Sequence, residues 1–308
     1  MRRSNPFGAL YKSGEIAATQ GVVLPNPLIM DVELTNHCNL NCVMCARRLM
    51  TREKGYMSGV HCFDLLVAEA KELGVKGIRF ILWGEPLLHP QVNAAIKFVR
   101  SCGLLVHLTT NGLLLPKLSV EAFDALDSLI VSFQGTTAAG YTEVRGDHFA
   151  EVTANLRRFL DLRGTRETPF IQGSTTILDE SIESQNVFSK WWTLQGVDRV
   201  STWHTNLERV KQLVPLSLYK RQSLPAREFR CIDPFYKMHV LWDGTCVACC
   251  DDVDGEILVG NFPTQSLAAI WDSEFYFDIR DQINFMKSGL KMAGNDLPKV
   301  CKNCYTRF

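Results

Sequence analysis

The stretch CNLNCVMC, residues 38–45, is the strongest indication in the sequence of the fold and of the chemistry of this chain. It carries Cys38, Cys42 and Cys45 with the spacing CxxxCxxC. Thiolates with this spacing can bind three irons of a cubane cluster and leave the fourth iron open to a small molecule. A zinc site is the alternative, but structural zinc usually takes CxxC pairs or a histidine that completes a tetrahedron, and His37 lies beside the first cysteine in the wrong register.

The cysteine motif follows an apolar run, LIMDVELT (28–35), which predicts a strand that ends just before it. A CxxxCxxC loop that leaves a strand resembles the signature of the radical S-adenosylmethionine (SAM) superfamily. In that family the open iron binds the amino and carboxylate groups of SAM. The residue before the last cysteine is often aromatic in the family; here it is Met44, whose thioether can still pack on an adenine ring.

The composition limits the class of protein. The chain has 308 residues, 46% of them hydrophobic, so it can bury a large core. Its 33 basic and 33 acidic side chains cancel, which leaves no basic field for nucleic acid and no polybasic membrane patch. No apolar run approaches about 18 residues, and the start of the chain, MRRSNPFGAL, lacks the apolar stretch of a signal peptide. We therefore expect a soluble, cytoplasmic protein.

The chain has eleven cysteines, and their number indicates metal ligation or redox chemistry because cytosolic thiols stay reduced. Only Cys62 and Cys102 stand apart from the cysteine-rich stretches, in segments with helical spacing. Because an isolated cysteine is most often a buried apolar residue, we predict that both belong to the core.

Apolar runs of about six residues alternate with longer segments of helical spacing, several of which end on glycine. Strand and helix repeated six times imply a parallel sheet with right-handed crossovers. The radical SAM resemblance implies that this α/β chain forms a partial (β/α)6 barrel with its chemistry at the carboxyl-terminal ends of the strands. The predicted strands are 28–34, 76–83, 104–110, 128–133, 169–177 and 197–203.

Polar residues and glycines follow these runs in the segments WGEP, TTNG, SFQG and TWHTN, at the rim where a barrel binds its ligands. By the family resemblance, Glu85 binds the amino group of SAM. Asn111, Ser132 and Gln134 are implied to contact its ribose or methionyl part. Arg145 is implied to bind its carboxylate, a geometry that a guanidinium suits.

A second cysteine-rich region follows residue 230 and resembles the twitch domain, a shortened SPASM module that holds an auxiliary [4Fe-4S] cluster. The implied cofactors are therefore SAM and two [4Fe-4S] clusters. Cys231, Cys301 and Cys304 supply three ligands of the second cluster. The predicted divisions of the chain are an amino-terminal extension (1–25), the radical SAM barrel (26–205), a connector (206–230) and the twitch domain (231–308).

The run CVACC (246–250) offers three thiols for the one remaining ligand position. In a strand, alternation would place Cys246 and Cys250 on one face and Cys249 on the other. We predict that Cys250 or Cys246 binds the cluster and that Cys249 is a free, catalytic thiol. The alternative is that Cys249, which better matches the family's spacing from the Asp-Gly turn, is the ligand.

The whole chain resembles the radical SAM epimerases of aminoglycoside biosynthesis, which convert neomycin C to neomycin B at C5‴. The resemblance implies that the 5′-deoxyadenosyl radical removes a hydrogen atom from one face and that Cys249 returns one to the other. An external one-electron reductant such as flavodoxin or ferredoxin is implied as a partner. A polycationic aminosugar needs local carboxylates. The candidate substrate contacts are His204 and the acidic stretch Asp251, Asp252, Asp254 and Glu256.

Three other functions fit part of the pattern. A twitch-domain dehydrogenase of an aminocyclitol or aminosugar alcohol would use the same clusters and return no hydrogen. A peptide maturase would be expected to carry a leader-peptide binding module, and none is visible in the sequence. An iron-sulfur electron carrier would not cleave SAM.

Overall fold

The computed structural model describes residues 3–58, 62–178, 181–204, 231–287 and 298–302. One curved sheet organises them, with the strand order β6-β5-β4-β3-β2-β1-β7-β8-β9. The first six strands are parallel, and β7 adds to β1 in the same direction. The parallel strands are β1 (Ile29–Val32), β2 (Gly77–Phe80), β3 (Leu105–Thr110), β4 (Ser128–Phe133), β5 (Phe170–Ile177), β6 (Arg199–His204) and β7 (Lys237–Val240).

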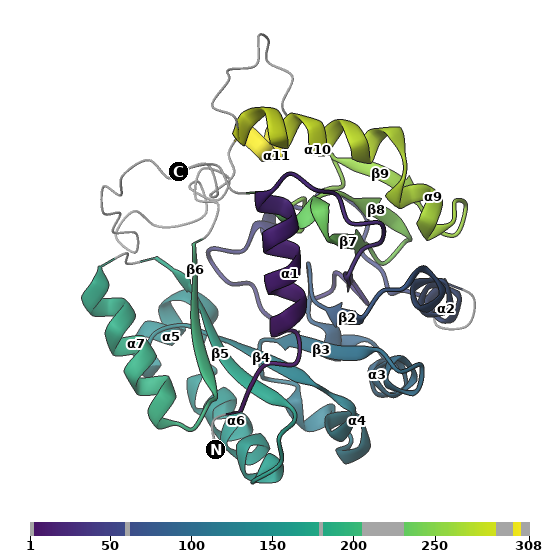
Figure 1. Ribbon diagram of the computed structural model, residues 1–308. Helices are drawn as coiled ribbons and strands as arrows, with labels where there is room; N and C mark the ends of the chain where they lie inside the picture. Colours follow the sequence, from purple (N-terminus) through teal and green to yellow (C-terminus); the bar gives the residue numbers. More distant parts are fainter. Residues whose placement is uncertain (1–2, 59–61, 179–180, 205–230, 288–297, 303–308) are drawn as a thin grey trace.

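Helices cover the outer, convex side of the sheet (Figure 1). They fold where the sequence shows apolar residues at helical spacing, and the left-handed Gly74 ends α2. The predicted partial (β/α)6 barrel is therefore confirmed. The covering helices are α2 (Asp64–Leu73), α3 (Val92–Ser101), α4 (Val120–Ala125), α6 (Phe149–Arg163) and α7 (Ile182–Leu194), with α5 (Ala138–Arg145) at the rim.

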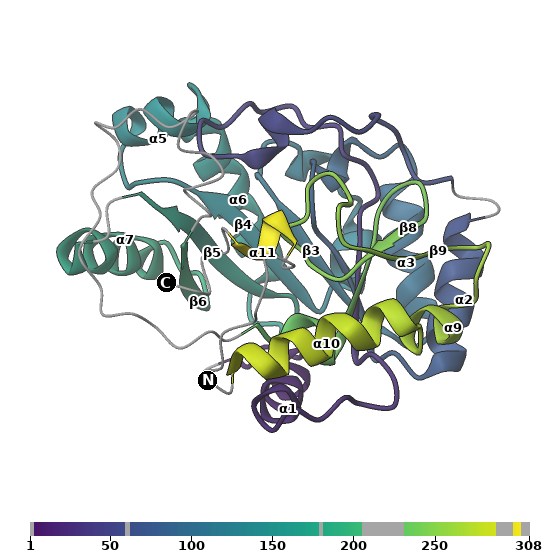
Figure 2. The same cartoon turned by 90° about the horizontal axis from the view of Figure 1, so that it is seen from above.

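The carboxyl-terminal strands β8 (Thr245–Val247) and β9 (Leu258–Asn261) are antiparallel and extend the barrel sheet beyond β7. Helices α9 (Leu267–Trp271), α10 (Glu274–Lys287) and the short α11 (Lys299–Lys302) follow (Figure 2). Strand β8 ends at Val247, where the β8–β9 register shifts. The alternation expected over residues 246–250 is therefore wrong beyond Val247, because the chain has left the strand before Cys249.

The amino-terminal helix α1 (Gly8–Thr19) packs against the barrel. The Tyr11 hydroxyl lies 3.2 Å from Nη1 of Arg79, which also binds Asp31 on the neighbouring strand. Burial alone would raise the pKa of Asp31, but Arg79 and His239 bring it well below its usual range. Arg79 and Asp31 thus form a buried ion pair in which Asp31 stays ionised near neutral pH.

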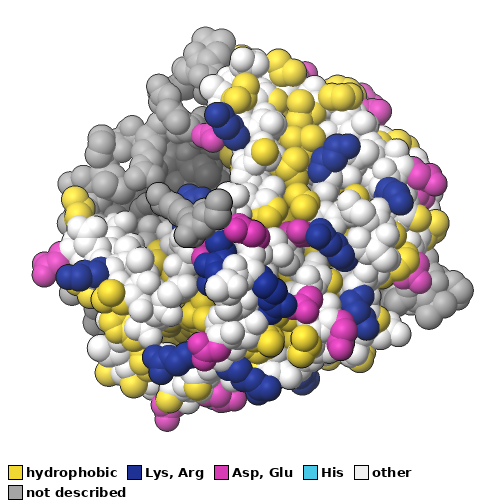
Figure 3. Space-filling view, turned by 60° about the horizontal axis from the view of Figure 1, so that its bottom comes forward, with side chains coloured by type: hydrophobic (Ala, Val, Ile, Leu, Met, Phe, Trp, Pro, Cys, Tyr) yellow, Lys and Arg dark blue, Asp and Glu magenta, His cyan; other side chains and the backbone are white. Residues whose placement is uncertain are grey.

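Basic and acidic side chains are interspersed on the face shown in Figure 3, in keeping with the zero net charge of the chain. None of the described helices is long and apolar enough to cross a membrane. Cys62 and Cys102 are partly buried and pack against the core.

Candidate functional site

The cysteine loop follows β1 and is fixed by its own polar residues. The Asn36 amide donates to the carbonyl of Glu53 at 2.8 Å and accepts from the N–H of Gly55 at 2.9 Å. Gly84, which follows β2, has φ +118° and lies so close that a Cβ there would be 2.2 Å from the carbonyl oxygen of Thr35. Only glycine fits this contact, so the rim loops of β1 and β2 pack backbone against backbone.

Two of the three thiols of this loop meet hydrogen-bond donors from two other rim segments. The amide of Asn111 points to Cys38 Sγ at 3.9 Å, and Nη1 of Arg145 points to Cys42 Sγ at 3.8 Å. Burial raises the pKa of Cys38 to about 11 and also raises that of Cys45. Buried sulfurs that face donors fit an iron-sulfur cluster, because iron replaces the thiol protons and donors to sulfur tune the cluster.

The described His, Cys, Asp and Glu side chains include no group of three placed to hold a single metal ion. A cubane spreads its cysteine ligands over separate irons, so its thiolates lie further apart than those of a one-metal site. The CxxxCxxC spacing and the donors around these thiols therefore support a cluster at this loop.

Arg145, the predicted partner of the SAM carboxylate, lies at the end of α5 and beside the cysteine loop. The N–H of Val43 donates to the carbonyl of Val144 at 3.0 Å, which joins α5 to this loop. The Nε of Arg145 is buried and has no hydrogen-bond partner in the structure. A buried guanidinium N–H without a partner is costly, and a SAM carboxylate would satisfy it.

Glu85 has different partners from those expected. It is 1% exposed, and its oxygens accept from the N–H of Leu87 at 3.1 Å, the hydroxyl of Thr110 at 2.8 Å and the N–H of Asn111 at 2.8 Å. The carboxylate thus holds the loop after β3 against the loop after β2. Glu85 therefore positions Asn111 at the cysteine loop, and its expected contact with the amino group of SAM stays a prediction.

Replacing Glu85 by glutamine should lower the free energy of unfolding by about 1–3 kcal/mol, because one accepting oxygen becomes an NH2 group that faces a donor. Burial raises the pKa of Glu85 from its ordinary 4.5 to about 7. The folded chain therefore holds this proton more tightly, and the contribution of Glu85 to stability falls as pH rises from about 4.5 to about 7.

Chemical unfolding at several pH values tests this prediction, with the exposed Glu72 on α2 changed to glutamine as the matched control. The Glu85→Gln variant should be less stable and should lack this pH-dependent contribution, whereas Glu72→Gln should match the wild type. Equal stability of both variants would contradict the anchoring role.

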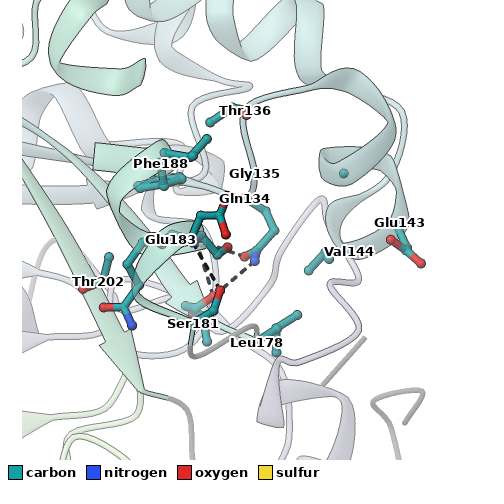
Figure 4. A pocket seen from close by; sticks show the side chains of 16 residues that line it. Gln134, Gly135, Thr136, Glu143, Val144, Leu178, Ser181, Glu183, Phe188 and Thr202 are labelled. Carbon is teal, nitrogen blue, oxygen red and sulfur yellow. Dashed lines mark hydrogen bonds between the residues drawn. The ribbon is translucent and has the colours of Figure 1, made fainter. Parts of the chain in front are cut away.

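The remaining predicted SAM contacts lie at the rim but are not all brought together. The amide of Asn111 also donates to Oδ1 of Asn39 at 2.8 Å, so Asn111 belongs to the cysteine loop's surroundings. Ser132 is half-buried in β4 opposite Ser174. Gln134 lines a cavity on the same rim together with Thr175 (Figure 4), and its expected contact with SAM stays a prediction.

The cysteines that follow residue 230 fall into two environments. Cys246 is fully buried, its thiol points to the carbonyl of Gly244 at 3.6 Å, and burial raises its pKa to about 12. Cys249 instead lies beside Cys250 and near Cys231. A hydrogen bond with the Cys250 thiol raises the pKa of Cys249 well above its usual range, and burial raises it further. The nearby Asp251 and Cys231 add to this shift. Cys246 is thus a core residue.

The other predicted cluster ligands lie at the end of the chain. Cys301 is partly buried on α11 and packs against the core. Cys304 lies outside the described residues, as do the connector 206–230 and the side chain of His204 at the end of β6. None of the ten cysteines within the described residues forms a disulfide.

The acidic stretch mostly serves the fold. Asp252 is fully buried, and its carboxylate accepts from the backbone N–H groups of Gly255, Glu256 and Ile257. The predicted substrate contact at Asp252 is therefore wrong, because all its hydrogen bonds close the turn after Cys250. Asp251 stays a candidate, since it is partly exposed beside Cys249 and its N–H donates to Cys249 Sγ at 3.3 Å.

Arg52 joins the two cysteine regions, and the sequence analysis missed it. Its guanidinium binds both oxygens of the buried Glu33, at 2.5 and 2.8 Å, and donates to the carbonyl of Val253 at 2.7 Å. The N–H groups of Thr51 and Arg52 both donate to Oδ1 of Asp254, at 2.7 and 3.3 Å. The only signal in the sequence was the acidic Glu33 at the end of an apolar run.

A barrel rim that carries three thiols of one loop, joined to a second cysteine region, defines an iron-sulfur enzyme of the radical SAM class. The model of the Radical SAM superfamily matches residues 32–184, and that of the SPASM iron-sulfur cluster-binding domain matches residues 231–305. The chain belongs to the radical SAM superfamily and carries a carboxyl-terminal SPASM or twitch domain, as the sequence predicted.

Curated relatives match about two fifths of the chain. A PqqA peptide cyclase of Gluconobacter oxydans is 32% identical over 128 residues, which are 41% of this chain and 36% of the relative. A probable GTP 3′,8-cyclase of Methanothermobacter thermautotrophicus is 31% identical over 134 residues, 42% of this chain and 43% of the relative. The chain thus spans about two fifths of the length of these relatives.

Solved structures extend the likeness over most of the chain and show the fold alone. Streptococcus suis SuiB bound to its precursor peptide SuiA covers 90% of this chain and 72% of its own, with a TM-score of 0.66 and 17% identity. BtrN in complex with AdoMet and 2-DOIA covers 85% of this chain and 89% of its own, with a TM-score of 0.57 and 17% identity.

Proposed function

We propose that the protein is an epimerase that inverts C5‴ of neomycin C to give neomycin B. One observation carries this proposal: Cys249 and Cys250 lie side by side after β8, near Cys231. A second cubane takes four thiolates, three of them from Cys231, Cys301 and Cys304. One thiol of the adjacent pair is then left for chemistry, and we assign this role to Cys249 and cluster ligation to Cys250.

The roles of the chain's own residues follow from their places. When bound, the first cluster and SAM supply a 5′-deoxyadenosyl radical. Cys38, Cys42 and Cys45 would hold that cluster, and Arg145 would fix the carboxylate of SAM through its unpartnered Nε–H. Asn111, positioned by Glu85, would keep a donor at Cys38.

Cys249 would complete the inversion. The bound cofactor would supply the radical that takes the hydrogen atom when the C5‴–H bond breaks. The S–H bond of Cys249 then breaks and a C–H bond forms on the opposite face, which is favourable because the S–H bond is the weaker of the two. The resulting thiyl radical needs one electron and one proton, and we propose that an external one-electron reductant such as flavodoxin or ferredoxin supplies the electron.

Two further observations support a small, polar substrate. The BtrN complex holds AdoMet and 2-DOIA, so the shared architecture accommodates SAM together with a second ligand. The neutral overall charge requires any cationic substrate to be bound by local carboxylates, and Asp251 is beside the proposed thiol. We further propose that the protein is cytoplasmic. We also propose four divisions of the chain: an extension (1–25), the barrel (26–205), a connector (206–230) and the twitch domain (231–308).

Product analysis tests the proposal. Reduced, cluster-loaded enzyme supplied with SAM and neomycin C should form 5′-deoxyadenosine and neomycin B. A ketone product would instead indicate the dehydrogenase of an aminosugar alcohol. Reduced enzyme that never cleaves SAM would indicate an electron carrier.

A further inference from the structure

Segment 51–55 is bound to the chain that leads into the first cysteine loop. The hydroxyl of Thr35 donates to the carbonyl of Gly55 at 2.6 Å. The side-chain oxygen of Asn36 accepts from the N–H of Gly55 at 2.9 Å. Thr35 and Asn36 come just before Cys38, so the segment and the first cysteine loop are held together where the loop begins.

The other side of segment 51–55 contacts the SPASM or twitch domain. Nε of Arg52 donates to the carbonyl of Val253 at 2.7 Å, and the N–H of Arg52 donates to Oδ1 of Asp254 at 3.3 Å. Gly55 lies so close to Trp242 that a Cβ at this glycine would be 2.4 Å from the indole ring. The segment is therefore held between the two cysteine regions, with contacts to both.

The turn that carries Cys249 is closed by its own hydrogen bonds. The N–H of Asp252 donates to the carbonyl of Cys249 at 3.2 Å, and the N–H of Ala248 donates to the carbonyl of Ile257 at 3.1 Å. The buried carboxylate of Asp252 binds three further N–H groups of the same turn. A contact that fixes Val253 within this turn therefore also fixes the backbone at Cys249.

Glu33 holds the guanidinium of Arg52 from the barrel side. Glu33 is fully buried directly after β1, and its carboxylate accepts from two nitrogens of Arg52, at 2.5 and 2.8 Å. The N–H of Trp242 donates to the same carboxylate at 3.2 Å. A lysine at position 52 would keep the charge but would lack the planar fork that binds both oxygens. Arg52 thus joins the end of β1 to the turn after the thiol pair.

We infer that Arg52 is a positioning residue for the return of hydrogen: by holding the turn after Cys250, it fixes where the Cys249 thiol lies relative to the barrel rim. The inference rests on the proposed epimerase function, which makes Cys249 the donor. A hydrogen atom passes from sulfur to carbon only when the two are in near contact, and a displacement of about 1 Å can slow such a step about 100-fold. Removal of the first hydrogen atom does not use Cys249. Loss of the Arg52 contacts should therefore lower the yield of inverted product for each SAM cleaved.

Arg52→Gln and Arg52→Lys test this inference in reduced, cluster-loaded enzyme supplied with SAM and neomycin C. The measured quantity is the amount of neomycin B formed per 5′-deoxyadenosine. This ratio should fall about tenfold in Arg52→Gln and less in Arg52→Lys, which keeps a cation beside Glu33. Partial loss of folded protein would lower both products equally, so it would leave the ratio unchanged.

Amide hydrogen exchange of the same variants gives a readout that does not depend on turnover. Peptides that cover the turn 249–257 should exchange several-fold faster in Arg52→Gln than in the wild type, because the turn loses its contact with the barrel. Peptides from β5 should exchange at the wild-type rate.

Arg163→Gln is the matched control. Arg163 is also a buried arginine that binds a carboxylate, that of Asp198, and donates to the carbonyl of Pro169, but these partners precede β6 and β5, at the end of the barrel opposite the rim. This variant should be less stable and should keep the wild-type ratio of products.

A wild-type ratio in Arg52→Gln, an equal fall in Arg163→Gln, or unchanged exchange of the turn 249–257 would overturn the inference while the epimerase function stands. If the wild type forms no neomycin B, the proposed function fails, and the role assigned to Arg52 fails with it.

Discussion

Replacing Cys249 by alanine should abolish formation of neomycin B while SAM cleavage continues. The variant keeps the first cluster and the residues beside it, so it still forms 5′-deoxyadenosine and removes the C5‴ hydrogen. It has no S–H bond from which the substrate radical can take a hydrogen atom on the opposite face. Chromatography of the aminoglycosides, with 5′-deoxyadenosine measured in the same reactions, checks this expectation.

Two further variants make the Cys249 experiment decisive. Cys250→Ala should lose iron from the auxiliary cluster, because Cys250 is assigned as its ligand, whereas Cys249→Ala should keep it. Cys102→Ala, which removes a partly buried thiol from the core, should retain both clusters and epimerisation. If the alanine variants at 249 and 250 show the reverse pattern, Cys249 is the ligand and its neighbour the candidate donor.

Replacing Cys42 by alanine should have an equally large effect, at an earlier step. Cys42 is the most buried of the three thiols in its loop and receives the Arg145 guanidinium, so no water-exposed ligand can readily replace it. The variant should lose roughly half of the bound iron, since each cubane holds the same number of irons. It should form no 5′-deoxyadenosine.

Iron analysis and a SAM cleavage assay of the reduced Cys42→Ala variant test this expectation. Cys62→Ala is the control, since Cys62 is partly buried and packs against the core. SAM cleavage by Cys42→Ala at the wild-type rate would show that the open iron is held by other residues.

The sequence predicted the barrel and the cysteine loop because both depend on local patterns. Buried parallel strands appear in the sequence as short apolar runs, and all three cysteines of the CxxxCxxC motif lie within one loop. Arg145 follows Val144, whose carbonyl joins its helix to the cysteine loop, so its predicted contact with the SAM carboxylate stays possible in this fold.

The errors arose where hydrogen bonds between distant residues decide what a side chain does. Glu85 was expected to bind the amino group of SAM, and no sequence pattern indicated that it also accepts hydrogen bonds from Thr110 and Asn111. Asp252 looked like one of a run of surface acids, but the turn after it wraps its own N–H groups around the carboxylate. Neither arrangement leaves a periodic pattern in the sequence.

Arg52 was missed for a related reason. It binds Glu33 at the end of β1 and Val253, which lies 201 residues later along the chain, and only the fold brings these two partners together. A single arginine in a loop is an ordinary surface residue in a sequence, so no motif indicated it.

Turnover of neomycin C in deuterated water measures the central claim most directly. The Cys249 thiol exchanges its hydrogen with solvent, so the account predicts one deuterium at C5‴ of the neomycin B formed by the wild type and no labelled product from Cys249→Ala. Neomycin B without deuterium at C5‴, or labelled neomycin B made by the alanine variant at the wild-type rate, would contradict it.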